Sequence, residues 1–251
     1  MTEFVVESKR LIDIFEKALI NKQLDKASAY LTQDSMHVSD ISQKVVGVIC
    51  IYRPPHFKQY HNIEPTEFMI TKDMLDGLEK LRFSQVELVT VSIQPDVGKI
   101  TFTGSDNSKK WETNLSAINK SEETGLSQTR IPWGIRHEAG VGLLPETGDI
   151  LSQFSLPVDK LTIPDVEQVS ISTTQGGDVI LECDYKGQFT DKVVPTAVRK
   201  TADIKKTVTV DYLKKALSNF TGVVWFTLYE QALILTQTNP DYELFYVQSV
   251  I

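Results

Sequence analysis

The stretch Phe68–Phe83, FMITKDMLDGLEKLRF, decides the fold because its pattern recurs near the C-terminus. Phe68 and Ile70 stand at alternate positions, as in a strand, and a helix is predicted from the spacing of the apolar residues that follow, Met74, Leu75, Leu78 and Leu81. The segment Val208–Phe220, VTVDYLKKALSNF, has the same order of strand and amphipathic helix. The chain therefore contains the same pattern of a strand followed by an amphipathic helix twice.

The segments after the two helices extend the repeat. The runs VELVTVSI and KITFTG predict a β-hairpin after the first helix, and VVWFTLYE and LILTQT predict one after the second. This order of elements is common in α+β proteins and is only suggestive by itself. The polar stretch between the copies, 119–148, strengthens the interpretation that they are two domains of similar fold. We expect two similar domains, 1–118 and 149–251, joined by a connector over 119–148.

The first domain is expected to open with a strand at Phe4–Val6 and a helix over Lys9–Ile20, with Ser8 as its N-cap. In the second domain the corresponding stretch is the short VDKLTIPD, bracketed by Pro157 and Pro164. Because proline ends helices, at most one or two turns fit there.

Composition describes an ordinary globular chain. The 251 residues are 41% hydrophobic and 24% charged, with a net charge of −7. No apolar run approaches the roughly 18–20 residues of a membrane span, and the N-terminus does not resemble a signal peptide. We therefore expect no membrane partner, a cytoplasmic location (nuclear in a eukaryote), and Cys50 and Cys183 as buried reduced thiols.

Chemical motifs are absent from the sequence. The four histidines lack zinc-site spacing, and no phosphate-binding glycine loop or nucleophile elbow is present. The acidic residues are dispersed through turns and strands. We expect no catalytic residues, no metal and no cofactor, while an enzyme on a two-domain α+β scaffold remains an alternative.

Basic residues gather on the predicted helices and before the last one. A solvated helix face is the simpler explanation for each, and a surface that faces phosphate is the functional one. The candidates are Lys9, Arg10, Lys17, Lys72, Lys80, Arg82, Lys160, Arg199, Lys200, Lys205, Lys206, Lys214 and Lys215.

The order of elements resembles the sliding DNA clamps of the proliferating-cell-nuclear-antigen type, as a divergent archaeal or viral member. The resemblance rests on the order over nearly the whole chain, on FKQY at the end of the Lys26–Tyr60 block, and on the terminal strand YELFYVQSVI. The chain departs from the family in its longer connector, its short first helix in domain two and a tail without proline.

The resemblance implies an α+β fold of two clamp domains, with sheets outside and helices facing a central hole. It further implies a ring, usually a homotrimer and in some members a heterotrimer, that encircles duplex DNA independently of sequence. Such a ring serves as a processivity factor for a DNA polymerase, is loaded by a clamp loader and takes part in replication and repair. A subunit of a hetero-oligomeric ring, heterotrimeric or checkpoint, is the alternative.

The resemblance also implies a pocket for the short peptide motifs of partner proteins. By position, its residues would be Ile41, Ile131, Pro132, Trp133, Ala232 and Val250. Ordinary core or loop packing is the alternative for each of them.

Overall fold

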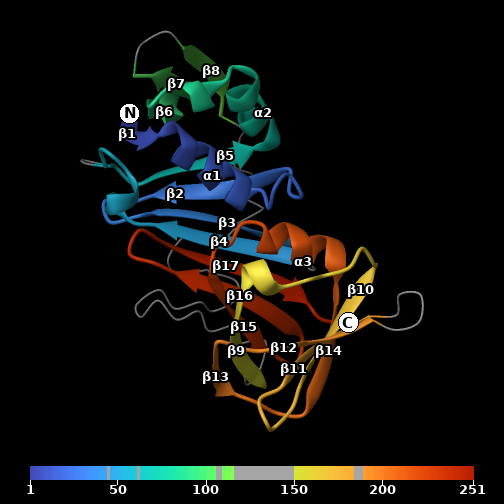
Figure 1. Ribbon diagram of the computed structural model, residues 1–251. Coiled ribbons are helices and arrows are strands. Elements are labelled where there is room, and N and C mark those ends of the chain that lie inside the picture. The colour runs from blue at the N-terminus through green and yellow to red at the C-terminus, as the bar shows by residue number, and fades with distance from the viewer. Residues whose placement is uncertain (44–45, 61–62, 106–108, 116–149, 184–188) are drawn as a thin grey trace. The chain divides into compact units, whose positions relative to one another are not determined.

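The computed structural model describes residues 1–43, 46–60, 63–105, 109–115, 150–183 and 189–251 (Figure 1). The chain divides into two compact units. Unit 1 comprises Met1–Asp40, Val48–Ile131 and Asn239–Glu243, and unit 2 comprises Ile41–Gly47, Pro132–Thr238 and Leu244–Ile251. The predicted connector, 119–148, and both of its boundaries lie outside the described residues, so these boundaries stay predictions.

The N-terminal half of the chain forms two antiparallel sets of strands and two helices. One sheet has the order β1-β6-β7-β8, and four further strands have the order β4-β3-β2-β5. The elements are β1 (Thr2–Glu7), α1 (Ser8–Ala18), β2 (Lys26–Leu31), β3 (Met36–Gln43), β4 (Val46–Tyr52), η1 (Pro54–His56), β5 (Thr66–Thr71), α2 (Lys72–Lys80), η2 (Phe83–Gln85), β6 (Leu88–Gln94), η3 (Pro95–Val97), β7 (Lys99–Gly104) and β8 (Lys110–Asn114).

Helix α1 forms where the apolar stripe predicts a helix. Leu11, Ile14 and Phe15 are buried along one side. The prediction for its start was wrong in one detail, because Ser8 is the first helical residue and its hydroxyl donates to the Val86 carbonyl instead of capping the helix. The helix also ends earlier than predicted, since the chain turns left-handed at Ile20.

Helix α2 is fixed at its start and along its side. The Thr71 hydroxyl accepts a hydrogen bond from the Met74 amide and so caps the first turn. Gly77 faces the Trp111 ring of β8, and a Cβ at this position would lie 2.5 Å from Trp111 Cζ2. The indole also stacks on Phe102, with ring centroids 5.3 Å apart. The absence of a side chain at Gly77 therefore lets β8 dock beside the helix.

The C-terminal half repeats this arrangement with one omission. One sheet has the order β12-β11-β10-β14, and five strands have the order β13-β9-β15-β16-β17. The elements are β9 (Ser152–Pro157), η6 (Val158–Lys160), β10 (Gln168–Thr173), β11 (Val179–Cys183), β12 (Phe189–Val193), β13 (Ala197–Lys200), β14 (Ile204–Thr209), α3 (Val210–Leu217), β15 (Val223–Leu228), β16 (Ala232–Thr238) and β17 (Tyr242–Ser249).

The internal repeat is confirmed. Helix α2 follows β5 and precedes the β6–β7 hairpin, just as α3 follows β14 and precedes the β15–β16 hairpin. The expected shortening of the first helix in the second copy is confirmed as well, because η6 is a single turn of three residues where the first copy has α1. Cys50 and Cys183 are free and buried, as predicted.

Several outer strands of these sheets have a backbone partner beyond the sheet. In unit 1, β1 is bridged by Gln59, whose carbonyl accepts from the Val5 amide. In unit 2, the amide of the last residue, Ile251, donates to the Thr207 carbonyl on β14. Within the described residues, β8 and β12 end their sheets without a further strand.

Gly77→Ala should destabilise the fold, because the new methyl group must displace the Trp111 ring. We expect a loss of about 1–3 kcal/mol in the free energy of unfolding, as for other overpacked sites. Urea unfolding measures it. The matched control is Gly176→Ala, where the added Cβ meets only the Thr174 hydroxyl at 3.6 Å. Equal stability of the two variants would contradict the role assigned to Gly77.

Candidate functional site

The helices of unit 1 carry balanced charge. Helices α1 and α2 together contain five basic and five acidic residues: Lys9, Arg10, Lys17, Lys72 and Lys80 against Asp13, Glu16, Asp73, Asp76 and Glu79. Ion pairs join several of these charges, and Lys22 lies 2.8 Å from Asp76 and 2.7 Å from Glu79. The helical surface of unit 1 is thus close to neutral.

The basic residues predicted on these helices differ strongly in exposure. Lys9, Lys80 and the nearby Arg82 are exposed and make no ion pair with another described residue. Lys72 lies 3.6 Å from Asp25. Lys17 is buried, and its ammonium lies 2.6 Å from Asp13 and 4.6 Å from the centre of the Tyr242 ring. It is therefore not one of the exposed cations.

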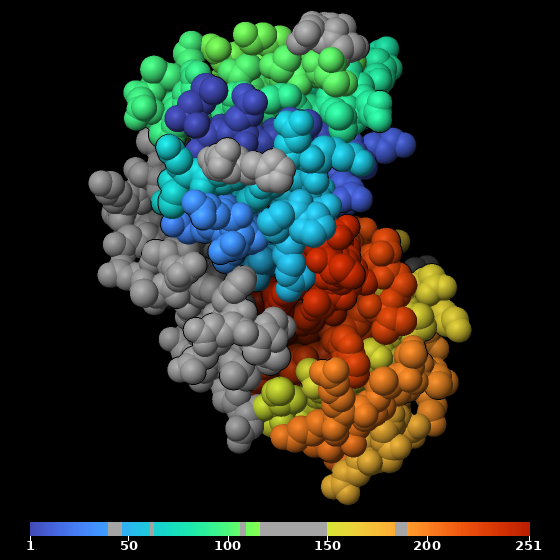
Figure 2. Space-filling view, turned by 90° about the vertical axis from the view of Figure 1, so that its left-hand side faces the viewer, coloured from blue at the N-terminus to red at the C-terminus, as the bar shows by residue number. Residues whose placement is uncertain are grey.

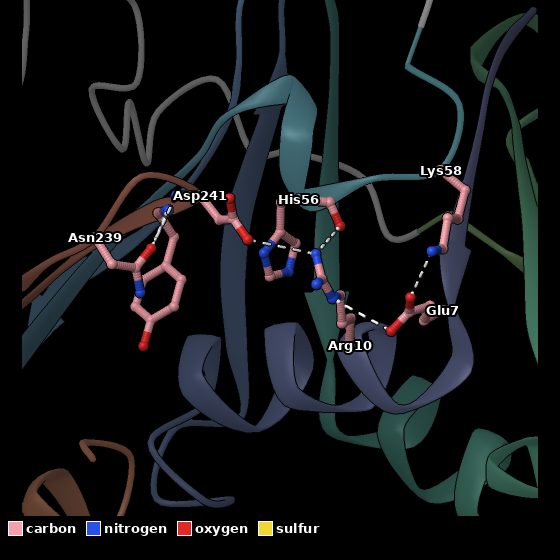
Figure 3. A network of polar contacts seen from close by, with 7 residues as sticks. Glu7, Arg10, His56, Lys58, Asn239 and Asp241 are labelled. Atoms are coloured by element: carbon pink, nitrogen blue, oxygen red, sulfur yellow. Dashed lines mark hydrogen bonds and ion pairs between the residues drawn. The ribbon is translucent and has the colours of Figure 1, made fainter. Parts of the chain in front are cut away.

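Arg10 belongs to a polar network at the start of α1 rather than to an open cationic surface (Figure 3). Its guanidinium lies 3.3 Å from the Glu7 carboxylate and 3.6 Å from that of Asp241, and it donates to the His56 carbonyl at 2.9 Å. Lys58 bonds Glu7 at 2.8 Å and holds the pKa of that carboxyl below its usual range. The network fastens η1 and the segment Asn239–Glu243 to the start of α1 within unit 1.

His56 is the buried centre of this network. Its side chain is enclosed by Tyr52, Phe57 and Tyr242, with ring centroids 4.8, 5.5 and 6.1 Å away. Neither ring nitrogen has a hydrogen-bond partner among the described residues. Burial, reinforced by the nearby Arg10 charge, lowers the pKa of His56 to about 4. The imidazole is therefore neutral at pH 7 and packs as an aromatic side chain.

The basic residues predicted in unit 2 are mostly paired. Lys214 bonds Asp165, Lys215 lies 3.1 Å from Asp211, and Lys205 lies 2.7 Å from Glu182. The register places Lys206 opposite the buried Ile171, so its side chain is largely covered and its ammonium donates to the Glu230 carbonyl.

The remaining predicted cations of unit 2 are Lys160, Arg199 and Lys200, and all three are exposed. Lys160 lies in η6. Arg199 and Lys200 lie on β13, not on a helix, and the Arg199 guanidinium carbon is 4.0 Å from the centre of the Trp225 ring. This contact was not predictable from the sequence, because β13 is only four residues long and Arg199 and Trp225 lie on different strands.

The predicted partner pocket is described in part. Ala232 opens β16, and the Val250 amide donates to the carbonyl of Gln231 next to it, at 3.1 Å. The structure thus brings the terminal tail beside the last hairpin. The backbone of Ile41 belongs to β3, while Ile131, Pro132 and Trp133 lie outside the described residues.

The described residues hold no cluster of side chains suited to a metal ion. None of the described helices is both long enough and apolar enough to span a membrane.

Lowering the pH from about 6.5 to 4 should destabilise the protein through His56. The unfolded histidine takes up a proton near pH 6.5, whereas the folded one resists protonation until about pH 4. The stabilising effect of the neutral buried ring is therefore complete above pH 6.5 and is lost as the pH falls. His56→Phe should flatten this part of the stability profile, measured by urea unfolding at each pH. Because the variant keeps the other three histidines, parallel profiles would show that His56 does not titrate as described.

Comparison with known proteins identifies the fold. No protein-family model matches the chain, and no curated protein matches it. Among solved structures, A. fulgidus PCNA bound to the C-terminal region of FEN-1 matches with a TM-score of 0.73 and 14% identity, over 100% of this chain and 98% of that chain. The PCNA of Entamoeba histolytica matches with a TM-score of 0.74 and 13% identity, over 100% of both chains. The chain therefore has the fold of a sliding clamp of the proliferating-cell-nuclear-antigen type.

Proposed function

We propose that this chain is the subunit of a DNA sliding clamp, without enzymatic activity, that encircles duplex DNA and keeps a DNA polymerase on its template. The observation that carries the proposal is the whole-chain similarity of fold to two PCNA structures at TM-scores of 0.73 and 0.74. Because one fold can serve several functions, the proposal also needs support from particular features of this chain.

Ring closure is the first of these features. Strands β8 and β12 are five residues long, end their sheets and have no further strand beside them among the described residues. An open strand edge readily adds another strand. We propose that β8 of one subunit pairs with β12 of the next, which closes a ring, most simply a trimer of identical subunits.

The backbone of β8 shows which groups this pairing would use. The Leu115 amide donates to the Gly98 carbonyl, and the Gly104 amide donates to the Lys109 carbonyl. In an antiparallel pair the inward-facing bonds fall on alternate residues. The backbone groups of Lys110, Glu112 and Asn114 therefore point away from β7, towards the position of an added strand.

Contact with DNA is the second feature. A surface with balanced charge attracts phosphate weakly, which suits a protein that slides and is held by its closed ring rather than by affinity. We propose that the exposed Lys9 and Lys80 make the helix contacts, with Arg82 and Lys160 as further candidates, while the paired lysines contribute less.

Partner binding is the third feature. The A. fulgidus match is bound to the C-terminal region of FEN-1, a peptide of another protein. We propose that replication and repair proteins, including the polymerase and a clamp loader, dock peptides beside Ala232 and Val250. The assignment of Ile41, Ile131, Pro132 and Trp133 to the same pocket stays a prediction from the sequence, and the last three lie outside the described residues.

A subunit of a heteromeric ring is the second candidate. The observation that favours it is the internal asymmetry of the chain, since η6 stands where the first copy has the helix α1. A chain that is monomeric alone and forms rings only with other clamp subunits would support this candidate.

Glu112→Pro should break the ring and leave the subunit folded. Proline removes the outward-facing amide of residue 112, and edge strands tolerate it there because this amide makes no bond to β7. We expect the mass in solution, measured by light scattering, to fall from that of a trimer to that of a monomer, with an unchanged far-ultraviolet circular dichroism spectrum.

The matched control for this change is Glu112→Thr. It also removes the ion pair between Glu112 and Lys99, which are 2.6 Å apart, but it keeps the outward amide. This variant should remain a ring. A Glu112→Pro protein with the wild-type mass would show that β8 does not join the subunits.

Lys9→Glu combined with Lys80→Glu should weaken the hold on DNA without opening the ring. The two changes turn the near-neutral helical surface of unit 1 acidic, so phosphate is repelled. The measurement is the fraction of protein retained on nicked circular DNA, compared with the same DNA after linearisation, at increasing salt.

Lys26→Glu combined with Lys58→Glu is the charge-matched control, because both residues are exposed and neither is among the residues predicted to face DNA. It should keep nearly wild-type retention. Equal losses in both double variants would mean that only net charge matters. Equal retention of wild-type protein on circular and linear DNA would refute encirclement.

A further inference from the structure

No further strand pairs with the outer edge of β13 among the described residues of unit 2. This strand is the outermost in the order β13-β9-β15, and all four of its residues, Ala197–Lys200, are exposed. The orange segment around residue 200 lies at the surface in Figure 2. An exposed strand edge offers backbone donors and acceptors to an extended peptide.

A bulge in β13 turns two cations to the same face. Ala197 pairs with Ser155 and Lys200 pairs with Gln153, so three residues of β13 advance against two of β9 between these pairs. Ser155 in turn pairs with Trp225 on β15. A bulge re-aims side chains in this way, and it brings Arg199 and Lys200 to the face that carries Trp225.

These two cations lack the acidic partners that other strand lysines of unit 2 have. Lys192, Lys205 and Lys206 each form an ion pair. Arg199 and Lys200 form none with the described residues, and the Arg199 guanidinium carbon lies over Trp225, 4.0 Å from the ring centre. On a chain with a net charge of −7, this edge is a cationic exception.

Apolar side chains border the same edge. Val198 and Val223 are each 43% exposed, and Val194 is 78% exposed. Val198 pairs with the buried Phe154, so it lies on the face opposite Trp225. Val223 shares the Trp225 face, but it lies on β15, which β9 separates from this edge. A strand added beside β13 would therefore meet Val198 on one face and the basic residues of β13 on the other.

We propose that the β13 edge, defined as Ala197–Lys200, binds an extended acidic segment of a partner protein by strand addition. Its alternate residues are acidic, towards Arg199 and Lys200, and apolar, towards Val198. This surface is separate from the pocket proposed at Ala232, because two strands, β9 and β15, lie between β13 and β16.

A peptide fits this edge better than single-stranded nucleic acid. Nucleic-acid sites of that kind stack bases on open aromatic faces. Here the guanidinium of Arg199 already covers a face of Trp225. The exposed valines and the open backbone edge, in contrast, match the side chains and the main chain of an extended peptide.

The test uses the intact chain and a fluorescein-labelled nonapeptide that alternates glutamate and valine. We expect saturable binding by fluorescence anisotropy, with no binding of the corresponding lysine–valine peptide. Methylation of every second backbone nitrogen should abolish binding, because strand addition needs those amides. Arg199→Glu combined with Lys200→Glu should weaken binding by at least about tenfold, and Lys26→Glu combined with Lys205→Glu should not.

Chemical shifts of the backbone amides locate the peptide, and the proposal expects the changes at residues 196–200. Changes confined to Ala232 and Val250 would overturn it, as would equal binding by the two double variants or full displacement by a short single-stranded oligonucleotide. The proposal would also be overturned if the unaltered protein bound no peptide and the Arg199→Glu, Lys200→Glu protein associated with itself. The bulge and its cations would then serve only to keep the edge from pairing.

Discussion

Every outermost strand of a sheet presents backbone N–H and C=O groups that need a partner, and this constraint organises the chain. Gln59 provides one for β1, the terminal residue Ile251 provides one for β14, and β13 provides one for β9. The edges that remain open among the described strands include β8 and β12, one in each half of the chain. Trp111 packs against Gly77 and so fixes β8 to α2, which ties an open edge to a helix. The proposed ring uses the β8 and β12 edges and leaves the β13 edge for another partner.

The charge distribution indicates that retention on DNA would not come from affinity for phosphate. Helices α1 and α2 carry equal numbers of acidic and basic residues, and most lysines of unit 2 are engaged by carboxylates. Such a surface gains little free energy from phosphate contacts, so affinity alone would not keep this protein on DNA. In the proposed function, a closed ring would supply the missing retention by topology. The proposed function therefore depends more on strand edges than on lysines.

The sequence predicted what depends on local periodicity and missed what depends on distant partners. Met74, Leu75 and Leu78 predicted α2, and Pro157 and Pro164 predicted the loss of the first helix in the second copy. The burial of Lys17 against Tyr242 was not predictable, because the two residues are far apart in the sequence. The same holds for β13, whose pairing with β9 joins residues about 42 positions apart and places Arg199 over Trp225.

Hydrogen exchange at the edge strands tests the central claim most directly. The amides of Lys110, Glu112 and Asn114 point away from β7, so in an isolated subunit they contact solvent. If β8 and β12 join subunits, these amides and those of β12 should become protected as protein concentration rises, in step with the increase in mass. Rapid exchange of these amides at every concentration, in a protein that nevertheless forms rings, would contradict the account.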